Sequence, residues 1–366
     1  MKLVTAVKNN LGKFSKTAGC WDGMVDRRSG KRSNLRDVAR AAGVSVATVS
    51  RVLNSPHIVS GETRQRVMAS IEDLHFVPSA AARAINSGRT KMVGALVPTL
   101  DNAIFAKFLA VLEERLGESG LSLLVAMTDG DPDIETLKAQ GLVDIGAEAL
   151  IVSGVTHSGA FDDLIRRTRI PAVATSYYDQ DYHLPTIGYD NAAASLTALQ
   201  FLHSEGHRRI AVFHGHQFNN DRTQARLKGL EKLSAAVKMD WFEADISIEG
   251  GSAAAKAFLN ANTSCTAILC LSDVLAMGAI FELQKNDVRL PDDVSIVGID
   301  DLPSSSFSNP PLTTVHLPVS KMGVETADAV IKWLENKITP KSTSIETKLM
   351  IRQSTKKLPY TNGPSN

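Results

Sequence analysis

From Met92 onwards, short apolar segments alternate with segments of helical periodicity, and this alternation constrains the fold more than any other feature. The first apolar segments are "MVGALVP", "LSLLVAM", "ALIVSG" and "PAVATS", and helices are expected to begin near Ala103 and Ile134. A further helix is expected from Asn191, and the apolar segments after it are "RRIAVFHG", "AILCLSD" and "VSIVGID". Near-continuous apolar strands are buried on both faces, which requires parallel sheets covered by helices. Residues 91–355 are therefore expected to form an α/β body of two lobes with parallel sheets and a cleft between them.

The charge of the chain is divided unevenly along its 366 residues, which are enough for two or three domains. Residues 1–91 carry 16 Lys and Arg against 6 Asp and Glu, whereas the remaining 275 residues carry 24 against 33. A basic module joined to an acidic body is expected when the module meets the phosphates of nucleic acid and the body does not.

Several features predict a cytoplasmic protein without a membrane partner. No apolar run is long enough to cross a bilayer, and residues 1–23 lack the apolar core of a secretory signal. Cys20, Cys265 and Cys270 have the spacing of neither a disulfide framework nor a zinc site.

The basic module contains three predicted helices within about 45 residues. An apolar stripe over 35–42 predicts the first helix, with Asn34 at its N-cap and Gly43 in the left-handed conformation that ends it. Ser45 can cap a second helix, and a third begins at Ser60. A glycine-containing turn between the first two helices is typical of a helix-turn-helix, whose second helix enters the major groove. The alternative is a small bundle used only for packing, but its basic charge and polar outer face would then have no use.

The motifs "DVARAAGVSVATVSRVLN" and "VSGETRQRVMASIEDLHFVPSAAARAI" are long and ordered, and residues 34–90 resemble the DNA-binding domain of the lac-repressor (LacI/GalR) family. The resemblance continues to about residue 355. It implies that the first residues of the second helix, here Val46 and Ala47, select bases, and that Arg51 reaches a guanine edge. A guanidinium can donate two hydrogen bonds to guanine O6 and N7, whereas valine and alanine offer only methyl contacts. The residues implied to lie near phosphates and bases are Thr48, Ser50 and Asn54.

The segment 78–90 joins the helix-turn-helix of residues 34–77 to the body. Its Pro78 and four alanines favour a helix that is too short to be stable alone. In the resembled family this hinge helix pairs with its dimer mate in the minor groove, where an apolar side chain opens a base step. The matching residue is Ile85, where the family usually has leucine. These properties imply a homodimer on double-stranded, pseudo-palindromic operator DNA. The alternative interpretation of residues 78–90 is an ordinary linker without a role in DNA binding.

Polar and aromatic residues follow the predicted strands of the body, where a small effector would bind. The resemblance implies that Arg226 and Asp300 hold the polar groups of the effector and that Phe105 or Tyr177 stacks on it. Carboxylates and guanidinium groups form hydrogen bonds with the hydroxyl groups of a sugar, and aromatic faces pack against the C–H side of its ring. A sugar or sugar acid is therefore expected as the effector. The full predicted set is Asn102, Phe105, Tyr177, Arg222, Arg226, Ser272 and Asp300.

Two positions leave alternatives open. Asp273 is equally suited to cap the following helix and to contact the ligand. If Arg222 faces the cleft without a charged partner, a carboxylate on the ligand would satisfy it, which slightly favours a sugar acid. If Arg222 instead pairs with Asp221 or another surface carboxylate, that preference disappears. The family often has asparagine at the position of Ser272.

Other classes of function are less well supported. No nucleophile with a base, paired carboxylates or nucleotide-binding glycine motif is evident, so neither an enzyme nor a cofactor is expected. His203 and His207 have a helical spacing but lack the glutamate of a zinc protease, and no metal is expected. A plain solute-binding protein would need an export signal and no helix-turn-helix. We expect a ligand-controlled transcription repressor, with an activator as the alternative, because the sequence does not separate the two. Residues 1–33 are expected to be a disordered extension, of which 1–23 are dispensable, and 356–366 a flexible tail.

Overall fold

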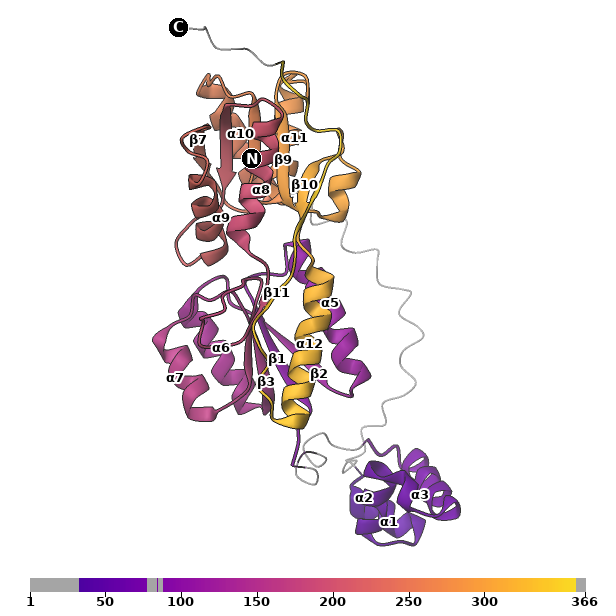
Figure 1. Cartoon of the computed structure of the whole chain (residues 1–366). Coiled ribbons are helices and arrows are strands. Elements are labelled where there is room, and N and C mark those ends of the chain that lie inside the picture. The colour runs from indigo at the N-terminus through magenta and orange to yellow at the C-terminus, as the bar shows by residue number, and fades with distance from the viewer. Residues whose placement is uncertain (1–32, 78–83, 85–87, 360–366) are drawn as a thin grey trace, which may run out of the picture. The chain divides into compact units, whose positions relative to one another are not determined.

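The computed structural model describes residues 33–77, 84 and 88–359, and the chain divides into two compact units between Asn86 and Ser87 (Figure 1). Ile85 and most of the expected hinge and N-terminal extension lie outside the described residues. Ser33, the last residue of that expected extension, is described, and its hydroxyl donates a hydrogen bond to the Leu74 carbonyl at 3.1 Å.

The N-terminal unit is the expected arrangement of three helices, α1 (Leu35–Ala42), α2 (Val46–Asn54) and α3 (Gly61–Asp73). Asn34 caps α1 as predicted, since its side chain accepts hydrogen bonds from the backbone of Arg36 and Asp37. Gly43 ends α1 with φ of 65°, and the next two helices are capped by Ser45 and Ser60. A short turn of 3-10 helix, η1 (Pro56–Ile58), joins α2 to α3. The buried side chains that hold the helices together are Val38, Ala39, Ala42, Val49, Val52, Val67 and Phe76.

The first lobe of the body is built on a six-stranded sheet in the order β11-β5-β4-β3-β1-β2, whose paired strands all run parallel. Helices α5 and α12 pack together on one face, and α6 and α7 cover the other (Figure 1). The elements are β1 (Met92–Val97), α5 (Ala103–Glu118), β2 (Ser122–Met127), α6 (Pro132–Asp144), β3 (Ala147–Ser153), α7 (Gly159–Thr168), β4 (Ala172–Thr175), β5 (Thr186–Gly188), α12 (Val319–Asn336) and β11 (Thr343–Ser344).

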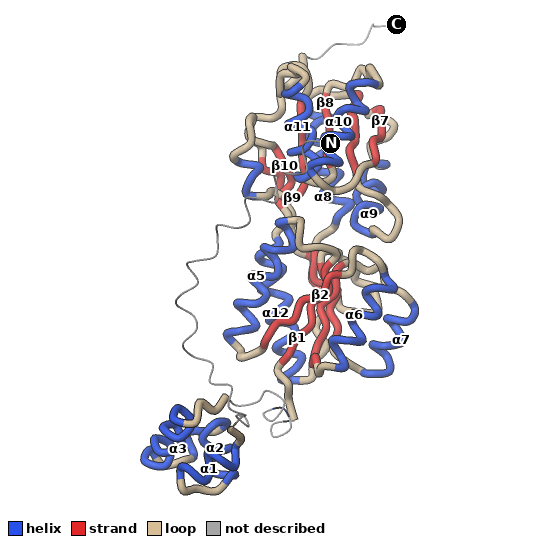
Figure 2. The backbone as a smooth tube through the Cα atoms, turned by 180° about the vertical axis from the view of Figure 1, so that it is seen from behind, coloured by secondary structure: helices blue, strands red, loops and turns tan. Residues whose placement is uncertain are grey.

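The second lobe has a six-stranded sheet in the order β12-β10-β9-β8-β6-β7. This sheet is mixed rather than parallel as predicted, because β12 runs antiparallel to β10. Helices α8 and α9 pack together, as do α10 and α11, on the two faces of the sheet (Figure 2). The elements are α8 (Asn191–Ser204), β6 (Arg209–His214), α9 (Asp221–Glu231), β7 (Lys238–Glu243), α10 (Ile248–Asn260), β8 (Ala267–Cys270), α11 (Asp273–Lys285), β9 (Ser295–Asp300), η2 (Pro303–Ser306), β10 (Thr313–His316) and β12 (Lys348–Met350).

The chain crosses between the lobes three times. It leaves the first lobe between β5 and α8, returns between β10 and α12, and passes from β11 to β12 near its end. These crossings follow strands β5 and β11, at one edge of the first sheet, and β10, next to the edge of the second. The carboxyl ends of the strands of the two sheets consequently border the space between the lobes.

The segment after β12 is attached to the second lobe. Ser354 is fully buried and donates a hydrogen bond to the Ile296 carbonyl at 2.6 Å. The backbone N–H of Leu358 donates to the Glu205 carbonyl at 2.8 Å. Residues 356–358, which the sequence analysis assigns to a flexible tail, therefore belong to the ordered body.

Helices α10 and α11 approach each other through glycines. A Cβ added to Gly278 would lie 2.0 Å from the Ile248 carbonyl oxygen, and one added to Gly251 would lie 2.2 Å from that of Leu275. Neither carbonyl can move freely, because the Ile248 carbonyl is part of the α10 backbone and the Leu275 carbonyl is part of the α11 backbone. The close approach of these two helices therefore requires glycine at both positions.

We expect Gly278→Ala to lower the free energy of unfolding by about 1–3 kcal/mol, the usual effect of overpacking. Gly141→Ala is the matched control, because a Cβ at this position in α6 would meet nothing within 4 Å. The control should stabilise the protein by roughly 0.5–1 kcal/mol, since glycine is unfavourable within a helix. Urea unfolding of both variants measures the difference, and equal stability of the two would contradict the close-contact argument.

Candidate DNA-reading helix and effector cleft

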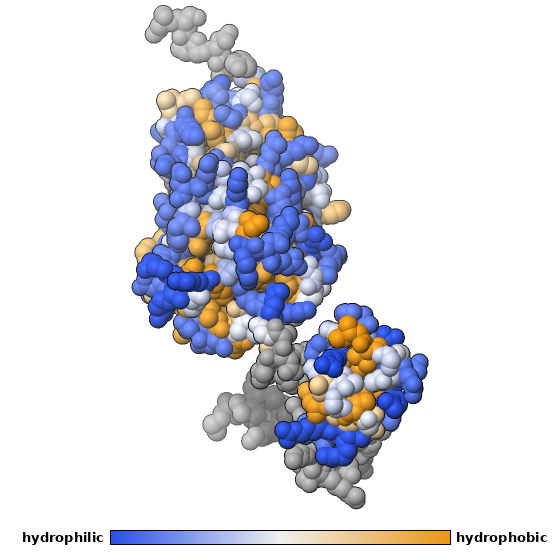
Figure 3. Space-filling model, turned by 60° about the horizontal axis from the view of Figure 1, so that its bottom comes forward, coloured by the Kyte–Doolittle hydropathy of each residue, from blue (hydrophilic) through white to orange (hydrophobic). Residues whose placement is uncertain are grey.

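Helix α2 presents the predicted reading residues on its exposed side. Val46 is 41% exposed, Ala47 and Arg51 are also exposed, and the inward-facing Val49 and Val52 are buried. Within the part of the chain that the structure describes, the Arg51 side chain has no hydrogen bond or ion pair, so its guanidinium is available to an external acceptor. Apolar and strongly hydrophilic side chains adjoin on the surface of this unit (Figure 3).

The other predicted DNA-contacting residues of α2 already make local contacts. The Thr48 and Ser45 hydroxyls share a hydrogen bond of 2.9 Å, and the Ser45 hydroxyl also accepts the Thr48 backbone N–H at 3.1 Å. Asn54 donates from Nδ2 to the Ser50 hydroxyl at 3.2 Å. These contacts fix the polar groups locally near the start and the end of α2, and their contact with DNA stays a prediction.

A cavity of about 150 Å³ lies between the two lobes of the body. Six of the seven predicted effector residues line it: Asn102, Phe105, Arg222, Arg226, Ser272 and Asp300. They come from both lobes, because Asn102 and Phe105 belong to the start of α5, whereas the other four belong to the second lobe.

Tyr177 is the predicted residue that does not line the cavity. Its backbone lies directly against Gly188, and the tyrosine on the cavity wall is instead Tyr189, which follows β5. The "TIGYD" segment already contained the signal for Tyr189, namely an aromatic residue directly after an apolar strand. Burial raises the pKa of Tyr189 above its usual value, so its phenol stays protonated at neutral pH.

Further residues of the cavity wall had weaker signals in the sequence. Ser176 follows β4, and Ile246 follows β7, a strand that the sequence analysis did not identify. Val319 and Met322 come from α12, which reaches the cavity only because the chain crosses back to the first lobe. The remaining wall residues are Pro98, Thr99, Ile104, Phe108, Asn220 and Thr223.

Arg226 and Asp300 form the polar centre of the cavity. Both side chains are buried, and Arg226 Nη1 lies 3.9 Å from Asp300 Oδ1. Arg226 donates from Nε to Asn191 Oδ1 at 3.0 Å and from Nη1 to the Leu271 carbonyl at 2.5 Å. Asp300 Oδ2 accepts the Ser272 hydroxyl at 2.8 Å. Both groups are therefore held in fixed orientations, which suits them to recognise a small polar ligand.

Asp300 is also unusual in its backbone and its acidity. Its φ of 132° is a conformation that side chains other than glycine rarely adopt, and such strain concentrates at functional sites. Burial raises the pKa of Asp300 to about 7, the Arg226 guanidinium acts in the opposite direction, and the nearby Asp273 carboxyl adds to the rise. Asp300 is consequently divided between its neutral and anionic forms near neutral pH.

Asp273 has neither of the two roles that the sequence left open. Ser272 caps α11, while the fully buried Asp273 accepts hydrogen bonds from the Leu302 backbone at 3.0 Å and from the hydroxyls of Ser305 and Thr314, each at 2.6 Å. Asp273, at the start of α11, therefore holds the segment that follows β9 together with strand β10.

Arg222 lines the cavity and also has a carboxylate partner. Its Nη1 atom lies 3.2 Å from Asp221 Oδ1, in an ion pair whose two side chains are largely buried. The alternative raised from the sequence, that Arg222 pairs with Asp221, is thus present, although Arg222 still borders the ligand space.

Effector affinity is expected to depend on pH because Asp300 titrates near neutrality. Ligand hydroxyls donate to the carboxylate, so the anionic form of Asp300 binds more tightly than the neutral form. Affinity should therefore rise by about tenfold as the pH increases from one unit below the Asp300 pKa to one unit above it. Titration calorimetry with the effector found by screening measures this, and a flat profile for wild type would contradict it.

The described residues contain no group of three or more His, Cys, Asp or Glu side chains arranged to hold a metal ion. His207 donates or accepts at 2.8 Å with the Thr266 hydroxyl, and its other ring nitrogen lies 3.2 Å from the Lys356 carbonyl oxygen. Over the same residues, no helix is long and apolar enough to cross a membrane.

Comparison with known families covers both units. Residues 34–79 match the model of "Bacterial regulatory proteins, lacI family", and residues 90–353 match that of "Periplasmic binding proteins and sugar binding domain of LacI family". The chain is 29% identical over 333 residues to the HTH-type transcriptional repressor PurR of Actinobacillus pleuropneumoniae serotype 3 (strain JL03). That alignment covers 89% of this chain and 99% of the relative.

Solved structures show the same architecture. The lac repressor dimer bound to operator and the anti-inducer ONPF has a TM-score of 0.81 and 25% identity, covering 89% of this chain and all of that one. A complex of the transcriptional regulator CelR with cellobiose has a TM-score of 0.65 and 27% identity, covering 88% of this chain and all of the other. Both units of this protein therefore have the fold of a DNA-binding repressor with an effector-binding domain, and not of an enzyme. The chain belongs to the LacI family of bacterial transcription regulators.

Proposed function

We propose that this repressor is controlled by a small uncharged sugar that binds between the lobes of the body. The observation that carries this proposal is the balance of charge at the cleft: Arg226 has Asp300 at 3.9 Å and Arg222 has Asp221 at 3.2 Å. Neither guanidinium needs a carboxylate from the ligand, so the preference for a sugar acid loses its premise.

The remaining groups of the cleft suit a polyhydroxylated ring. Asn102, Ser272 and Asp300 offer amide, hydroxyl and carboxylate groups to hydroxyls, and Phe105 and Tyr189 offer aromatic faces to the C–H side of the ring. The family model of the body describes a sugar-binding domain, and the similar CelR structure is a complex with cellobiose. These similarities support a carbohydrate as the effector class.

The proposal includes a homodimer on a pseudo-palindromic operator. The similar lac repressor is a dimer on its operator, and two reading helices of one dimer would contact half-sites about one helical turn apart. Val125 and Met127 are exposed and lie two positions apart on the edge strand β2, so their side chains point to the same face of the sheet. Adjoining exposed apolar side chains can mark partner surfaces.

Two linked experiments test the function. Selection from a random pool of DNA duplexes should yield a two-fold symmetric site, bound by a protein that sediments as a dimer. A thermal-shift screen of sugars, sugar acids and phosphosugars should then identify a ligand that alters binding to that site. An asymmetric site bound by a monomer would contradict the dimer proposal.

Titration calorimetry on wild type and Arg222→Gln, with a sugar acid and its neutral parent, separates the two effector classes. We expect the neutral sugar to bind wild type more tightly than the acid does. Tighter binding of the acid, lost in Arg222→Gln, would reverse the assignment and identify Arg222 as its carboxylate ligand.

A further inference from the structure

The Asp221 carboxylate joins the two lobes across the cleft. Asp221 begins α9 of the second lobe, yet its Oδ2 atom accepts the backbone N–H groups of Val155 and Thr156, which follow β3 of the first lobe. The bond from Thr156 is 3.0 Å long, and the Asp221 side chain is buried. Two successive backbone N–H groups directed at one carboxylate oxygen form a strong, charge-assisted contact.

The backbone of the first lobe permits this contact only at a glycine. Gly154 has φ of 86°, and a Cβ added to it would lie 2.4 Å from both Asp221 Oδ2 and Arg222 Nη1. A side chain at position 154 would therefore occupy the space of the contact itself, in a backbone conformation that favours glycine.

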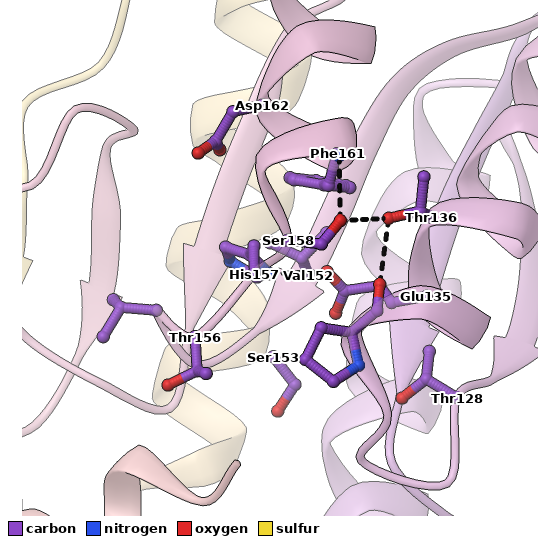
Figure 4. A network of polar contacts seen from close by, with 12 residues as sticks. Thr128, Glu135, Thr136, Val152, Ser153, Thr156, His157, Ser158, Phe161 and Asp162 are labelled. Carbon is purple, nitrogen blue, oxygen red and sulfur yellow. Dashed lines mark hydrogen bonds and ion pairs between the residues drawn. The ribbon is translucent and has the colours of Figure 1, made fainter.

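The segment that receives Asp221 is itself anchored within the first lobe (Figure 4). Ser158 caps α7, and its hydroxyl shares a hydrogen bond of 2.7 Å with the Thr136 hydroxyl of α6. His157 Nδ1 lies 2.5 Å from Glu135 Oε1 in the same helix. Because this segment is tied to two helices, a movement of Asp221 relative to it requires the lobes to separate or the contact to break.

The position of the contact complements the chain crossings. The crossings follow β5 and β11 at one edge of the first sheet, whereas β3 lies two strands from β5 toward the other edge. Covalent connections alone leave the lobes free to open about that edge. A polar contact at the end of β3 restrains this opening.

We propose that Asp221 is an interlobe latch, a positioning residue that holds the cleft closed and whose state the effector changes through Arg222. Arg222 Nη1 lies 3.2 Å from Asp221 Oδ1 and 3.5 Å from the Ser153 hydroxyl, and the Arg222 side chain also lines the cavity. Among the described atoms, Asp221 Oδ1 has no hydrogen-bond partner. A ligand acceptor that engages Arg222 competes with Asp221 for the guanidinium. The regulatory part of this inference rests on the proposed function.

Amide hydrogen exchange at residue resolution tests the latch on the full chain, without operator or effector. We expect Asp221→Ala to increase the exchange rates of the Val155 and Thr156 amides roughly tenfold or more, because each loses its acceptor. Asp221→Asn should give a smaller increase, since its amide oxygen can still accept. Gly154→Ala should also increase exchange, although it retains the carboxylate.

Asp240→Asn is the matched control. Asp240 pairs with Arg209 at 3.2 Å within the second lobe, so its loss removes a partly buried ion pair without affecting the space between the lobes. Exchange at Val155 and Thr156 should stay at the wild-type rate in this variant. Unchanged exchange in Asp221→Ala, or an equal increase in Asp240→Asn, would overturn the latch.

Arg222→Gln tests the coupling separately. Removal of the guanidinium leaves the two backbone hydrogen bonds in place but removes the ion pair that orients Asp221, so an intermediate increase in exchange is expected. An unchanged rate in Arg222→Gln would overturn the coupling while the latch stands. Because these readouts need no effector, they remain decisive if the proposed sugar is wrong.

Discussion

Arg51→Ala should abolish operator discrimination while the fold and effector binding stay intact. The guanidinium is exposed on α2 and has no partner among the described residues, so its loss leaves no unsatisfied group inside the protein. A bidentate contact to guanine is worth about 1–3 kcal/mol in each half-site, and a dimer has two half-sites. Competition between the selected operator and unrelated DNA, at matched salt, measures the lost discrimination.

Arg64→Ala on the exposed side of α3 is the control for the loss of one positive charge. It should weaken binding to all sequences alike, if at all, because non-specific attraction follows charge. Substitutions of Val46 and Ala47 should instead change which operator is preferred. Wild-type discrimination by Arg51→Ala would show that the role assigned to Arg51 is wrong.

Asp300→Asn should produce a repressor that binds its operator but needs a much higher concentration of the effector to respond. The amide keeps the shape of the side chain and can still accept from the Ser272 hydroxyl, so the fold is retained. Hydrogen bonds to a charged acceptor contribute about 1.5–3 kcal/mol each, so effector affinity should fall roughly ten- to hundredfold. Calorimetry above the Asp300 pKa, where wild type is anionic, gives the largest contrast.

Asp301→Asn is the neighbouring control. Asp301 also has a positive φ, but its carboxylate accepts Arg352 Nη2 at 2.6 Å and pairs with His316 Nδ1 at 2.9 Å, and it does not line the cavity. Effector affinity in this variant should stay near that of wild type. A loss of affinity in both variants would indicate a general disturbance of the segment after β9, whereas full affinity in Asp300→Asn would remove Asp300 from the site.

The sequence by itself determined the local features of both units. The caps at Asn34, Ser45 and Ser60 depend on neighbouring residues, so they could be predicted before any tertiary contact was known. Strand ends could be predicted as well, because apolar runs define the strands of a parallel sheet. The carboxyl ends of such strands meet at one edge, which accounts for Asp300 at the end of β9, whereas Arg226 lies within α9 and was expected at the cavity only from the family resemblance.

The tertiary structure alone decided which side chains complete the cleft and which charges pair. Val319 and Met322 line the cavity because α12 crosses back to the first lobe, and no local pattern encodes that return. Tyr189, directly after β5, lines the cavity, whereas Tyr177, in the segment after β4, does not. The path of the chain after each strand decides which tyrosine reaches the cavity. The ion pair of Arg222 with its sequence neighbour Asp221 was one of the alternatives raised from the sequence, but the contact of Asp221 with the loop after β3 depends on how closely the two lobes approach. Periodicity and capping act over a few residues, whereas the contact between Thr156 and Asp221 joins residues that are 65 positions apart in the sequence.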